Sequence, residues 1–454
     1  MIRGVSRRLA VHLRLADHTL ERPHRVVSMN ARAPKGTADL LPATARAWEH
    51  LTRTAQRLFA AYGYEPIYTP LFEHTEVFTR GIGEATDIVS KEMYTFEDKG
   101  GRSLTLRPEG TASVVRAALE HNLVANGQFA KVYYAGPMFR YERPQKGRMR
   151  QFWQIGAELL GAAEPTADAE LIVLLWRFFE ECGIPAESMR LLLNSMGDEN
   201  CRPAYRDKVA SFIRAHADSL CEECNRRADT NPLRAFDCKN PACKSIMAEA
   251  PLLRDEMCDE CSQHYATVKA HLDALDIPYV EDPSLVRGLD YYTRTVFEVQ
   301  ADAGLGSQNA IGGGGRYDRL MEAYDGPATP GLGFALGFER TLLAMEAVGA
   351  AIGGPPLAQV YVASVDDAVR GDAFGITCAL RDAGVATETD HQARSLKSQF
   401  KQADRLGASY VVVVGPDELA SGEVTVRDMA TKAERRAAVD AVPAELRAAL
   451  GLEA

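Results

Sequence analysis

Residues 131–158 alternate in polarity with a period of two, and this pattern predicts a β-hairpin around a basic loop. The first arm is expected over Lys131–Glu142, with a break at Gly136-Pro137, and the second over Gln151–Glu158. One face of the second arm is apolar, and the other carries Phe152, Gln154, Gly156 and Glu158. Burying an amide and a carboxylate is costly unless a ligand pairs with them. The alternative is a solvated face of an antiparallel sheet, and the alternation leaves both open.

The remainder of the first 352 residues mixes helix and strand patterns. Helices are expected over residues 44–61, 167–182 and 337–348, and strands over residues 67–69, 103–106, 290–300 and 306–311. Residues 197–265 show little periodicity, so we expect them to form an inserted module.

A chain of 454 residues is too long for one ordinary domain, and Gly353-Gly354-Pro355-Pro356 is typical of a linker. Beyond it, strands expected over residues 359–365, 385–388 and 410–414 alternate with helices, which predicts parallel βαβ units. We therefore expect one domain over residues 29–352, interrupted by the module, and a separate α/β domain over residues 357–454.

The first 28 residues carry six arginines and only two acidic residues, Asp17 and Glu21. Such a start is typical of an organelle transit peptide. We favour the alternative of a disordered extension, or of a start assigned too early with Met29 as the true start, because the segment has poor amphipathic order. No apolar run reaches the roughly 18–20 residues needed to span a bilayer, so we expect a cytoplasmic protein.

Six of the nine cysteines form three close pairs, Cys221-x2-Cys224, Cys238-x4-Cys243 and Cys258-x2-Cys261. This spacing is typical of zinc sites, and without a secretory signal a disulfide framework is a poor first guess. We assign no metal from the sequence; if a structural Zn²⁺ is present, two of the three pairs would hold it, and Cys221, Cys224, Cys258 and Cys261 are the candidate ligands. The alternative is that these cysteines are small buried residues or unliganded thiols.

Two glycine-rich segments lack the common nucleotide-binding patterns. Gly312–Gly315 is followed by Arg316 rather than by Lys-Ser or Lys-Thr, and the glycines of residues 331–337 have the wrong spacing for a dinucleotide fingerprint. If the chain binds a nucleotide, arginines must hold the phosphates, because their planar fork matches phosphate oxygens.

Five segments together resemble a known family. A helix ending in a strand and Pro70, the segment FRYE at residues 139–142 with its hairpin, and GLGFALGFER at residues 331–340 resemble the three motifs of class II aminoacyl-tRNA synthetases. LVRGLDYY at residues 285–292 and GGGRYD at residues 313–318 resemble segments specific to histidyl-tRNA synthetases, and RPEGT at residues 107–111 is also typical of them. The resemblance implies an α+β catalytic domain built on an antiparallel sheet and a C-terminal α/β anticodon-binding domain.

The resemblance implies ATP-dependent ligation of L-histidine to tRNA(His) through a histidyl-adenylate. Arg140 would hold the α-phosphate, Glu142 would face the adenine amino group, Phe152 would stack on adenine, and Arg340 would hold the γ-phosphate. Mg²⁺ would accompany the ATP, and Arg287 would bridge the histidine carboxylate and the α-phosphate, which makes Arg140 and Arg287 the expected catalytic residues.

The resemblance also implies a histidine pocket. Glu158 and Tyr292 would satisfy the two imidazole nitrogens. The other expected residues of this pocket are Glu109, Gly110, Thr111, Gln154, Arg287, Tyr291 and Tyr317. A pocket of this kind rejects apolar analogues without an editing domain, because its own polar groups would otherwise stay unpaired.

Two basic segments are expected to contact tRNA. The net charge of −10 does not favour nucleic-acid binding by the whole chain, so local patches are needed. Arg148 and Arg150 lie in the hairpin loop, and Arg394, Lys397 and Lys401 are spaced along one face of a predicted helix. A basic stripe is equally typical of a solvated helix face. The family resemblance also implies a homodimer.

Two alternatives share parts of this pattern. Synthetase-like regulatory subunits of ATP phosphoribosyltransferase have the catalytic fold without the anticodon domain and lose signature residues. Prolyl and threonyl synthetases lack the pattern of residues 285–292, which this chain has.

Overall fold

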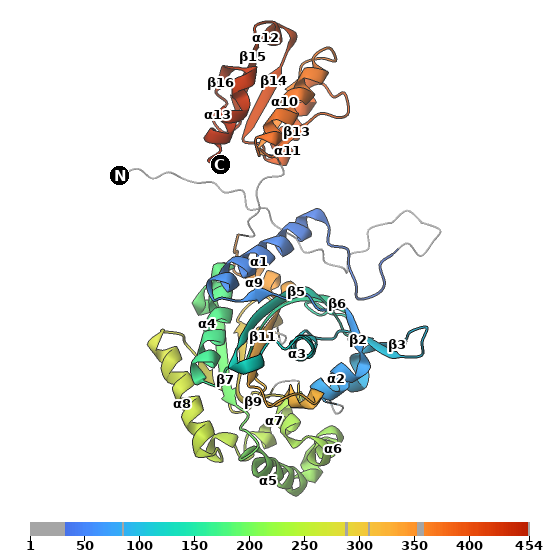
Figure 1. Ribbon diagram of the computed structural model, residues 1–454, viewed down its shortest axis with the longest axis vertical. Helices are drawn as coiled ribbons and strands as arrows, with labels where there is room; N and C mark the ends of the chain where they lie inside the picture. Colours follow the sequence, from blue (N-terminus) through green and yellow to red (C-terminus); the bar gives the residue numbers. More distant parts are fainter. Residues whose placement is uncertain (1–31, 84–85, 287–288, 307–308, 352–357, 453–454) are drawn as a thin grey trace. The chain divides into compact units, whose positions relative to one another are not determined.

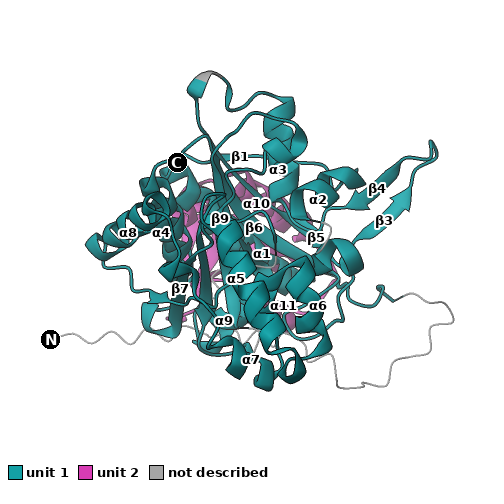
Figure 2. Cartoon of the chain, turned by 90° about the horizontal axis from the view of Figure 1, so that it is seen from below, with its two compact units in different colours: residues 1–352 teal, residues 353–454 magenta. Residues whose placement is uncertain are grey.

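The computed structural model describes residues 32–83, 86–286, 289–306, 309–351 and 358–452, and the expectations for residues 1–28 and Met29 lie outside them. The chain divides into two compact units, residues 1–352 and 353–454 (Figures 1 and 2). Each unit has its own sheet and its own hydrophobic core.

The first unit is built on an eight-stranded sheet with the order β1-β5-β6-β11-β10-β9-β7-β8. Neighbouring strands are antiparallel except for β1 with β5 and β7 with β8. The prediction of an antiparallel sheet in an α+β domain is therefore confirmed. The strands are β1 (Glu65–Pro66), β5 (Ala130–Phe139), β6 (Gln151–Leu160), β7 (Met189–Ser195), β8 (Val280–Glu281), β9 (Thr293–Ala301), β10 (Ala310–Arg316) and β11 (Gly331–Gly337).

The predicted hairpin is confirmed as β5 and β6, and its apolar face lies in the core. Ile155 and Ala157 are fully buried, and Trp153 packs against the same cluster. The expected break at Gly136-Pro137 is wrong, because β5 continues through Pro137, which lies opposite Trp153. Proline is tolerated there because β1, on the other side of β5, pairs only with Val132 and Tyr133, so no ladder bond from Pro137 is needed.

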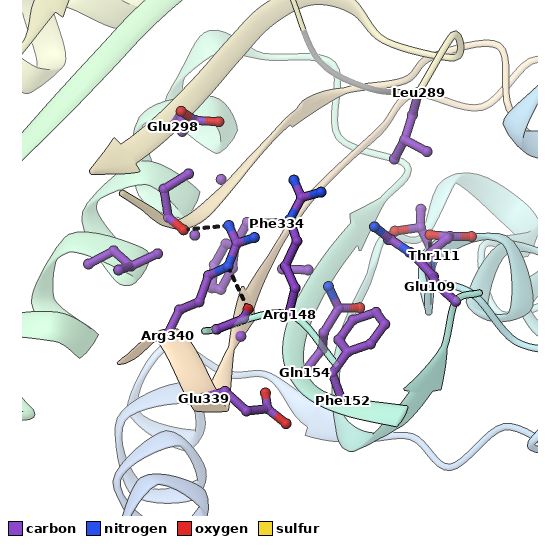
Figure 3. A pocket seen from close by; sticks show the side chains of 18 of the residues that line it. Glu109, Thr111, Arg148, Phe152, Gln154, Leu289, Glu298, Phe334, Glu339 and Arg340 are labelled. Atoms are coloured by element: carbon purple, nitrogen blue, oxygen red, sulfur yellow. Dashed lines mark hydrogen bonds between the residues drawn. The ribbon is translucent and has the colours of Figure 1, made fainter. Parts of the chain in front are cut away.

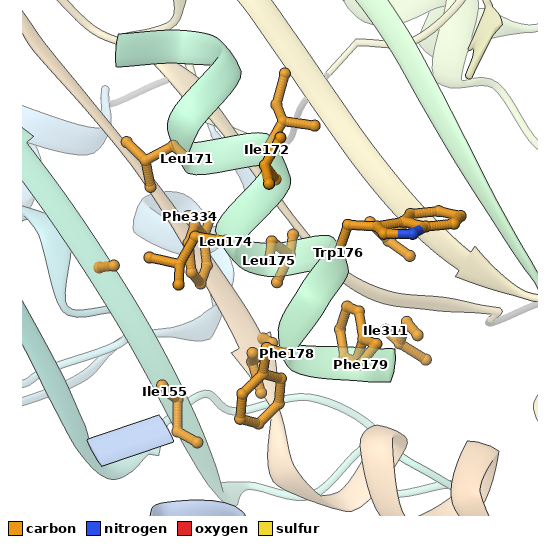
Figure 4. Packing of buried hydrophobic residues seen from close by; sticks show 14 of the residues in the cluster. Ile155, Leu171, Ile172, Leu174, Leu175, Trp176, Phe178, Phe179, Ile311 and Phe334 are labelled. Atoms are coloured by element: carbon orange, nitrogen blue, oxygen red, sulfur yellow. The ribbon is translucent and has the colours of Figure 1, made fainter. Parts of the chain in front are cut away.

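Four helices pack with the sheet to form the core of the first unit. In Figure 4, Phe179 of α4 lies beside Ile311 of β10, and Leu174 of α4 lies near Phe334 of β11. The three predicted helices are confirmed, with ends within a few residues of those expected. The four helices are α1 (Pro42–Ala61), α4 (Pro165–Glu181), α8 (Asp259–Ala274) and α9 (Phe338–Ala347).

The glycine run of residues 312–315 belongs to a strand, β10, whereas the sequence pattern placed a strand over residues 306–311. A Cβ on Gly314 would lie 1.9 Å from the carbonyl oxygen of Gly333, so β10 and β11 approach too closely for any side chain there. The strand expected over residues 67–69 is also wrong, because the strand β1 ends at Pro66, before these residues. The strand expected over residues 103–106 is confirmed as β4.

Smaller elements surround the sheet. A three-stranded sheet consists of β2 (Phe72–His74), β4 (Ser103–Leu106) and β3 (Tyr94–Glu97). The helix α2 (Thr75–Ile82) packs against it, and α3 (Thr111–Glu120) packs against α2 and β6. Residues 197–265, which we call the cysteine-rich insertion, contain no strand and leave the sheet after β7. Its helices are α5 (Arg202–Ala215), α6 (Glu222–Thr230), α7 (Pro241–Met247) and the first part of α8.

The second unit has a five-stranded sheet with the order β13-β12-β14-β15-β16. The three predicted strands are confirmed as β12 (Val360–Ser364), β13 (Thr387–Thr389) and β14 (Tyr410–Val414), all parallel. The antiparallel strands β15 (Glu423–Asp428) and β16 (Glu434–Ala438) were not predicted. Its helices are α10 (Arg370–Asp382), α11 (Leu396–Leu406), α12 (Pro416–Ala420) and α13 (Val442–Ala449). None of the helices in the described ranges is both long and apolar enough to cross a membrane.

Candidate active site

A pocket opens on the polar face of the hairpin, over β5, β6, β10 and β11 (Figure 3). The turn before α3 and the first turn of α9 contribute further side chains to its wall. Nearly every described candidate for histidine or ATP lies here. The predicted residues that line the pocket are Glu109, Thr111, Arg140, Glu142, Phe152, Gln154, Tyr291, Tyr292 and Arg340.

Glu158 lies just behind the wall of this pocket, with no exposed surface. Its carboxylate accepts hydrogen bonds from Thr111 Oγ1 at 2.7 Å, Tyr134 OH at 3.4 Å and Tyr317 OH at 2.5 Å. Burial raises its pKa to about 8, although the three hydroxyl donors oppose the shift. A carboxylate offers about four lone-pair sites, so three donors leave room for one more.

Gly333 of β11 makes room for this carboxylate. It is the cross-strand neighbour of Glu158, and a Cβ at Gly333 would lie 1.7 Å from Glu158 Oε2. The carboxylate therefore occupies the place of a missing side chain.

Tyr134 is a site residue that the sequence analysis missed. It lines the pocket, and its ring fills the space left by two glycines, since a Cβ on Gly110 or Gly156 would lie 2.2 Å or 2.3 Å from ring atoms. Its position on β5 opposite Gly156 places it on the same face as Glu158. The sequence signal for it is the same period of two, because Tyr134 shares the even-numbered face of the first arm with Arg140 and Glu142.

Glu109, Thr111 and Gln154 form the polar wall beside Glu158. Both oxygens of Glu109 accept backbone N–H groups at the start of α3, from Thr111 and Ala112 at 2.8 Å each. Burial nevertheless raises the pKa of Glu109. The Gln154 side-chain oxygen is buried without a hydrogen-bond partner among the described residues, so it is available to a donor from a bound molecule.

Tyr291, Tyr292 and Tyr317 form an aromatic cluster, of which Tyr291 and Tyr292 line the pocket and Tyr317 is buried behind it. The ring centroids of Tyr291 and Tyr292 are 4.8 Å apart, and those of Tyr291 and Tyr317 are 5.5 Å apart. Tyr317 donates to Glu158, so the cluster and the buried carboxylate form one unit. The expected catalytic residue Arg287 lies outside the described residues.

Three arginines share the other end of the pocket. Arg140 lies 5.2 Å from the ring centroid of Phe152 and donates to the Pro108 carbonyl at 2.9 Å. Arg148 forms an ion pair with Glu142 at 3.0 Å. Arg340, in the first turn of α9, donates to the carbonyl groups of Gly147 and Ala310 (dashed lines in Figure 3).

The three arginines repel one another, although Glu142, Glu298 and Glu339 also line the pocket. Burial, together with repulsion from Arg148 and Arg140, lowers the pKa of Arg340. An anion would relieve that repulsion, and the N-terminus of α9 also favours a negative charge. This end of the pocket is therefore suited to phosphate groups.

Two family models match the chain. The one described as Histidyl-tRNA synthetase covers residues 36–341, and the one described as Anticodon binding domain covers residues 359–449. The histidine–tRNA ligase of Halothermothrix orenii is 48% identical over 403 residues, which is 89% of this chain and 96% of that protein. The chain belongs to the histidyl-tRNA synthetase family.

Solved structures agree with this membership. The crystal structure of apo S. aureus histidyl-tRNA synthetase is 37% identical, with a TM-score of 0.78, and the match covers 92% of this chain and 99% of that one. A Bacillus halodurans chain described as an ATP phosphoribosyltransferase regulatory subunit/histidyl-tRNA synthetase shares the fold at 20% identity and a TM-score of 0.61.

Within the family segment GGGRYD, Arg316 and Tyr317 have different surroundings. Arg316 is 1% exposed and pairs with Asp168 of α4, which also lies 3.3 Å from His264 of α8. This arginine therefore joins β10 to two helices of the core, while the next residue reaches Glu158. The segment combines a structural role with a site role.

The residues expected to contact tRNA are placed unevenly. Arg148 lines the pocket, and Arg150 lies 3.9 Å from the ring centroid of Tyr141. In the second unit, Lys397 and Lys401 are exposed on α11, but Arg394 precedes this helix. Arg394 instead lies 3.8 Å from Asp390 and donates to Gln392. The expected single helical face is therefore wrong for Arg394.

The cysteine pairs separate into two clusters. Cys221, Cys224, Cys238 and Cys243 form cluster 1, and Asp198, Cys201, Cys258 and Cys261 form cluster 2. The predicted ligand set of Cys221, Cys224, Cys258 and Cys261 is therefore wrong, because its two halves belong to different clusters. Spacing identifies which cysteines are close in the chain, but only the fold decides which pairs meet.

Proposed function

We propose that this protein activates L-histidine with ATP and transfers it to tRNA(His), as the relatives' name histidine–tRNA ligase describes. The observation that carries the proposal is the fully buried Glu158, held by three hydroxyl groups, at one end of a pocket whose other end has three arginines. This arrangement joins a site for a polar ring to a site for a polyphosphate.

At the amino-acid end, Glu158 accepts one imidazole N–H at its remaining lone pair, and Tyr292 serves the other ring nitrogen. Gln154 accepts from the α-ammonium group, for which its unpaired oxygen is suited. Glu109 adds negative charge near the same group, while Thr111, Tyr291 and Tyr317 hold Glu158 and the ring in place. Gly110 leaves the space that Tyr134 fills.

At the nucleotide end, Phe152 stacks on adenine, Glu142 accepts from its amino group, and Arg140 holds the α-phosphate. Arg340 holds the γ-phosphate at the N-terminus of α9. Because Arg148 lies in the pocket, we assign it to the phosphates and to Glu142 rather than to tRNA. Glu298 would offer carboxylate oxygens to the Mg²⁺ that accompanies ATP, and the ion would neutralise phosphate charge.

The reaction requires little covalent work from the protein. The histidine carboxylate attacks the α-phosphate in line, diphosphate leaves, and the tRNA 3′ end then takes the histidyl group from the adenylate, releasing AMP. The arginines stabilise the charge that develops on the phosphate oxygens. Arg287 bridges the carboxylate and the α-phosphate in this proposal.

The contacts with tRNA(His) are proposed for two places. Arg150 of the hairpin loop contacts the acceptor end, and Arg394, Lys397 and Lys401 contact the anticodon region, in keeping with the matched anticodon-binding model. We also propose that the protein acts as a homodimer in the cytoplasm.

ATP–diphosphate exchange with each amino acid in turn tests the proposal. We expect exchange with histidine alone, and Glu158→Gln should raise the histidine KM or abolish exchange, because the amide brings donors into a site that already has three. No exchange with any amino acid would instead favour a regulatory subunit. Exchange with another amino acid, or unchanged kinetics in Glu158→Gln, would contradict the proposed specificity.

A further inference from the structure

The cysteine-rich insertion places its thiols in two groups of ligand size. In cluster 1 and in cluster 2, the four candidate ligand atoms all lie within 4.8 Å of one another. Most of these side chains are buried, with Cys221 and Cys258 partly exposed. Together the two clusters use seven of the nine cysteines, and Cys182 and Cys378 belong to neither.

The distances match a tetrahedral metal site. With Zn–S bonds of about 2.3 Å, two thiolates on one zinc ion lie about 3.8 Å apart. The Cys221 and Cys238 sulfurs are 3.9 Å apart, and so are those of Cys201 and Cys261. A disulfide would need about 2.0 Å, and all nine cysteines are free.

The carboxylate of cluster 2 is equally well placed. Asp198 Oδ1 lies 3.6 Å from Cys201 Sγ and 3.8 Å from Cys258 Sγ. Without a metal, three thiols and a carboxylate would gather at a buried place with only weak hydrogen bonds between them. This gathering is difficult to explain by packing alone.

We propose that each cluster binds one zinc ion, with four cysteines as ligands in cluster 1 and three cysteines and Asp198 in cluster 2. Thiolate ligands select zinc over the hard cations Mg²⁺ and Ca²⁺. Four protein ligands leave no open position, so both sites are structural rather than catalytic.

Cluster 1 fastens the interior of the insertion. Cys221 is the N-cap of α6, Cys224 lies in its first turn, Cys238 ends the short helix after it, and Cys243 lies in α7. The Cys221 backbone N–H donates to Cys243 Sγ at 3.3 Å, and the N-terminus of α6 favours negative charge. The ion would therefore join three short helices that have little core of their own.

Cluster 2 fastens the insertion to the catalytic sheet. Asp198 and Cys201 follow β7, where the chain leaves the sheet, and Cys258 and Cys261 begin α8, by which it returns. A Cβ on Gly197, whose φ is +64°, would lie 2.7 Å from Cys201 Sγ, so this turn needs glycine beside the sulfur. The ion would hold both ends of the insertion together.

Cluster 2 is also connected by hydrogen bonds to the segment that carries Tyr292, a residue of the pocket lining. Arg294 donates to Asp198 at 3.3 Å, as expected for a ligand carboxylate held by a second residue. Arg202, next to Cys201, donates to the Tyr292 carbonyl at 2.6 Å. The second ion would therefore stabilise the position of the segment that contains Tyr292 and Arg294.

The test is a metal count on the full chain, purified and reconstituted anaerobically with zinc. We expect two ions per chain in the unmodified protein. Cys221→Ser/Cys238→Ser and Cys258→Ser/Cys261→Ser should each bind one, and the control Cys378→Ser should bind two. When Co²⁺ replaces zinc in the unmodified protein, we expect two equivalents to bind. The bound ions should show thiolate-to-cobalt charge-transfer bands and tetrahedral d–d bands. This measurement uses no variant, so it does not depend on whether a variant folds.

Several results would overturn the proposal. Saturation of the unmodified protein by fewer than two equivalents of Co²⁺, or octahedral spectra without thiolate bands, would do so. Loss of both ions from either double variant, while its circular dichroism matches that of the unmodified protein, would overturn the assignment of separate sites. None of these results depends on amino-acid activation.

Discussion

At the scale of single residues, the pocket depends on a carboxyl group that folding has removed from water. Glu158 has no exposed surface, and its pKa of about 8 means that it is mostly protonated at pH 7 in the free protein. Three hydroxyl groups reduce this shift but do not cancel it. A ligand N–H that donates to the group would favour its ionised form.

Histidine binding should therefore release a proton from Glu158 near pH 7. The protonated fraction of free histidine also loses its ring proton on binding. The quantity to compare is therefore the number of protons released by the unmodified protein and by Glu158→Gln. Calorimetry in buffers of different ionisation enthalpy should show greater proton release with glutamate than with glutamine. Equal release by the two proteins would contradict an ionised Glu158 in the complex.

Gly333→Ala should damage histidine activation through Glu158. The new Cβ would lie 1.7 Å from Oε2, so the carboxylate must leave its place, and we expect a loss of roughly 100-fold or more in kcat/KM for histidine. Steady-state exchange measures this, with the KM for ATP as the internal comparison.

A double-variant cycle provides the control for Gly333→Ala. Glu158→Asp withdraws the carboxylate by one methylene group, so its effect combined with Gly333→Ala should be clearly less than additive. Strictly additive losses would mean that the two residues act independently, against the close contact across β6 and β11.

At the scale of elements, the ends of helices carry the charges. At the N-terminus of α3, backbone N–H groups already donate to the Glu109 carboxylate. At the N-terminus of α9, by contrast, Arg340 faces the open pocket. In α11, Leu396, Phe400, Ala403 and Leu406 pack on the sheet of the second unit, and Lys397 and Lys401 face outwards. The helix therefore separates a packing face from a basic face.

Reversing the charge at Lys397 and Lys401 should weaken tRNA charging without affecting amino-acid activation. Lys397→Glu/Lys401→Glu removes two exposed positive charges, and we expect the KM for tRNA(His) to rise by roughly ten-fold or more. ATP–diphosphate exchange should stay unchanged. Lys432→Glu, an exposed lysine in the turn between β15 and β16 of the same unit, is the control. Equal effects of all these changes would indicate a non-specific charge effect.

At the scale of the whole molecule, the two units have separate cores and only the first contains the pocket. Every residue that lines the pocket precedes residue 352. The clusters of buried apolar side chains are also confined to one unit or the other.

A fragment of residues 1–352 should therefore fold and activate histidine without charging tRNA. We expect its exchange activity to stay within roughly ten-fold of that of the full chain, while aminoacylation of tRNA(His) falls far more. Comparing the two assays on one preparation separates the effects. Loss of exchange together with a cooperative unfolding transition would show that the second unit contributes to the pocket.

The sequence by itself determined the features that depend on local pattern. Period-two alternation placed Ile155 and Ala157 in the core and Gln154 towards the pocket, and helical spacing located α1, α4 and α11. Family segments identified the residues that the fold then brought together. These signals survive in the sequence because each depends on neighbours within a few residues.

The tertiary structure alone decided what depends on distant neighbours. Gly314 lies where β11 passes too close for a Cβ, and the fold raises the pKa of Glu158 by burying it, against the opposing hydrogen bonds from Tyr134 and Tyr317. The cysteine pairs likewise sorted into two clusters, one of which includes Asp198. Such contacts join residues that the chain separates by tens to more than a hundred positions, and no local period records them.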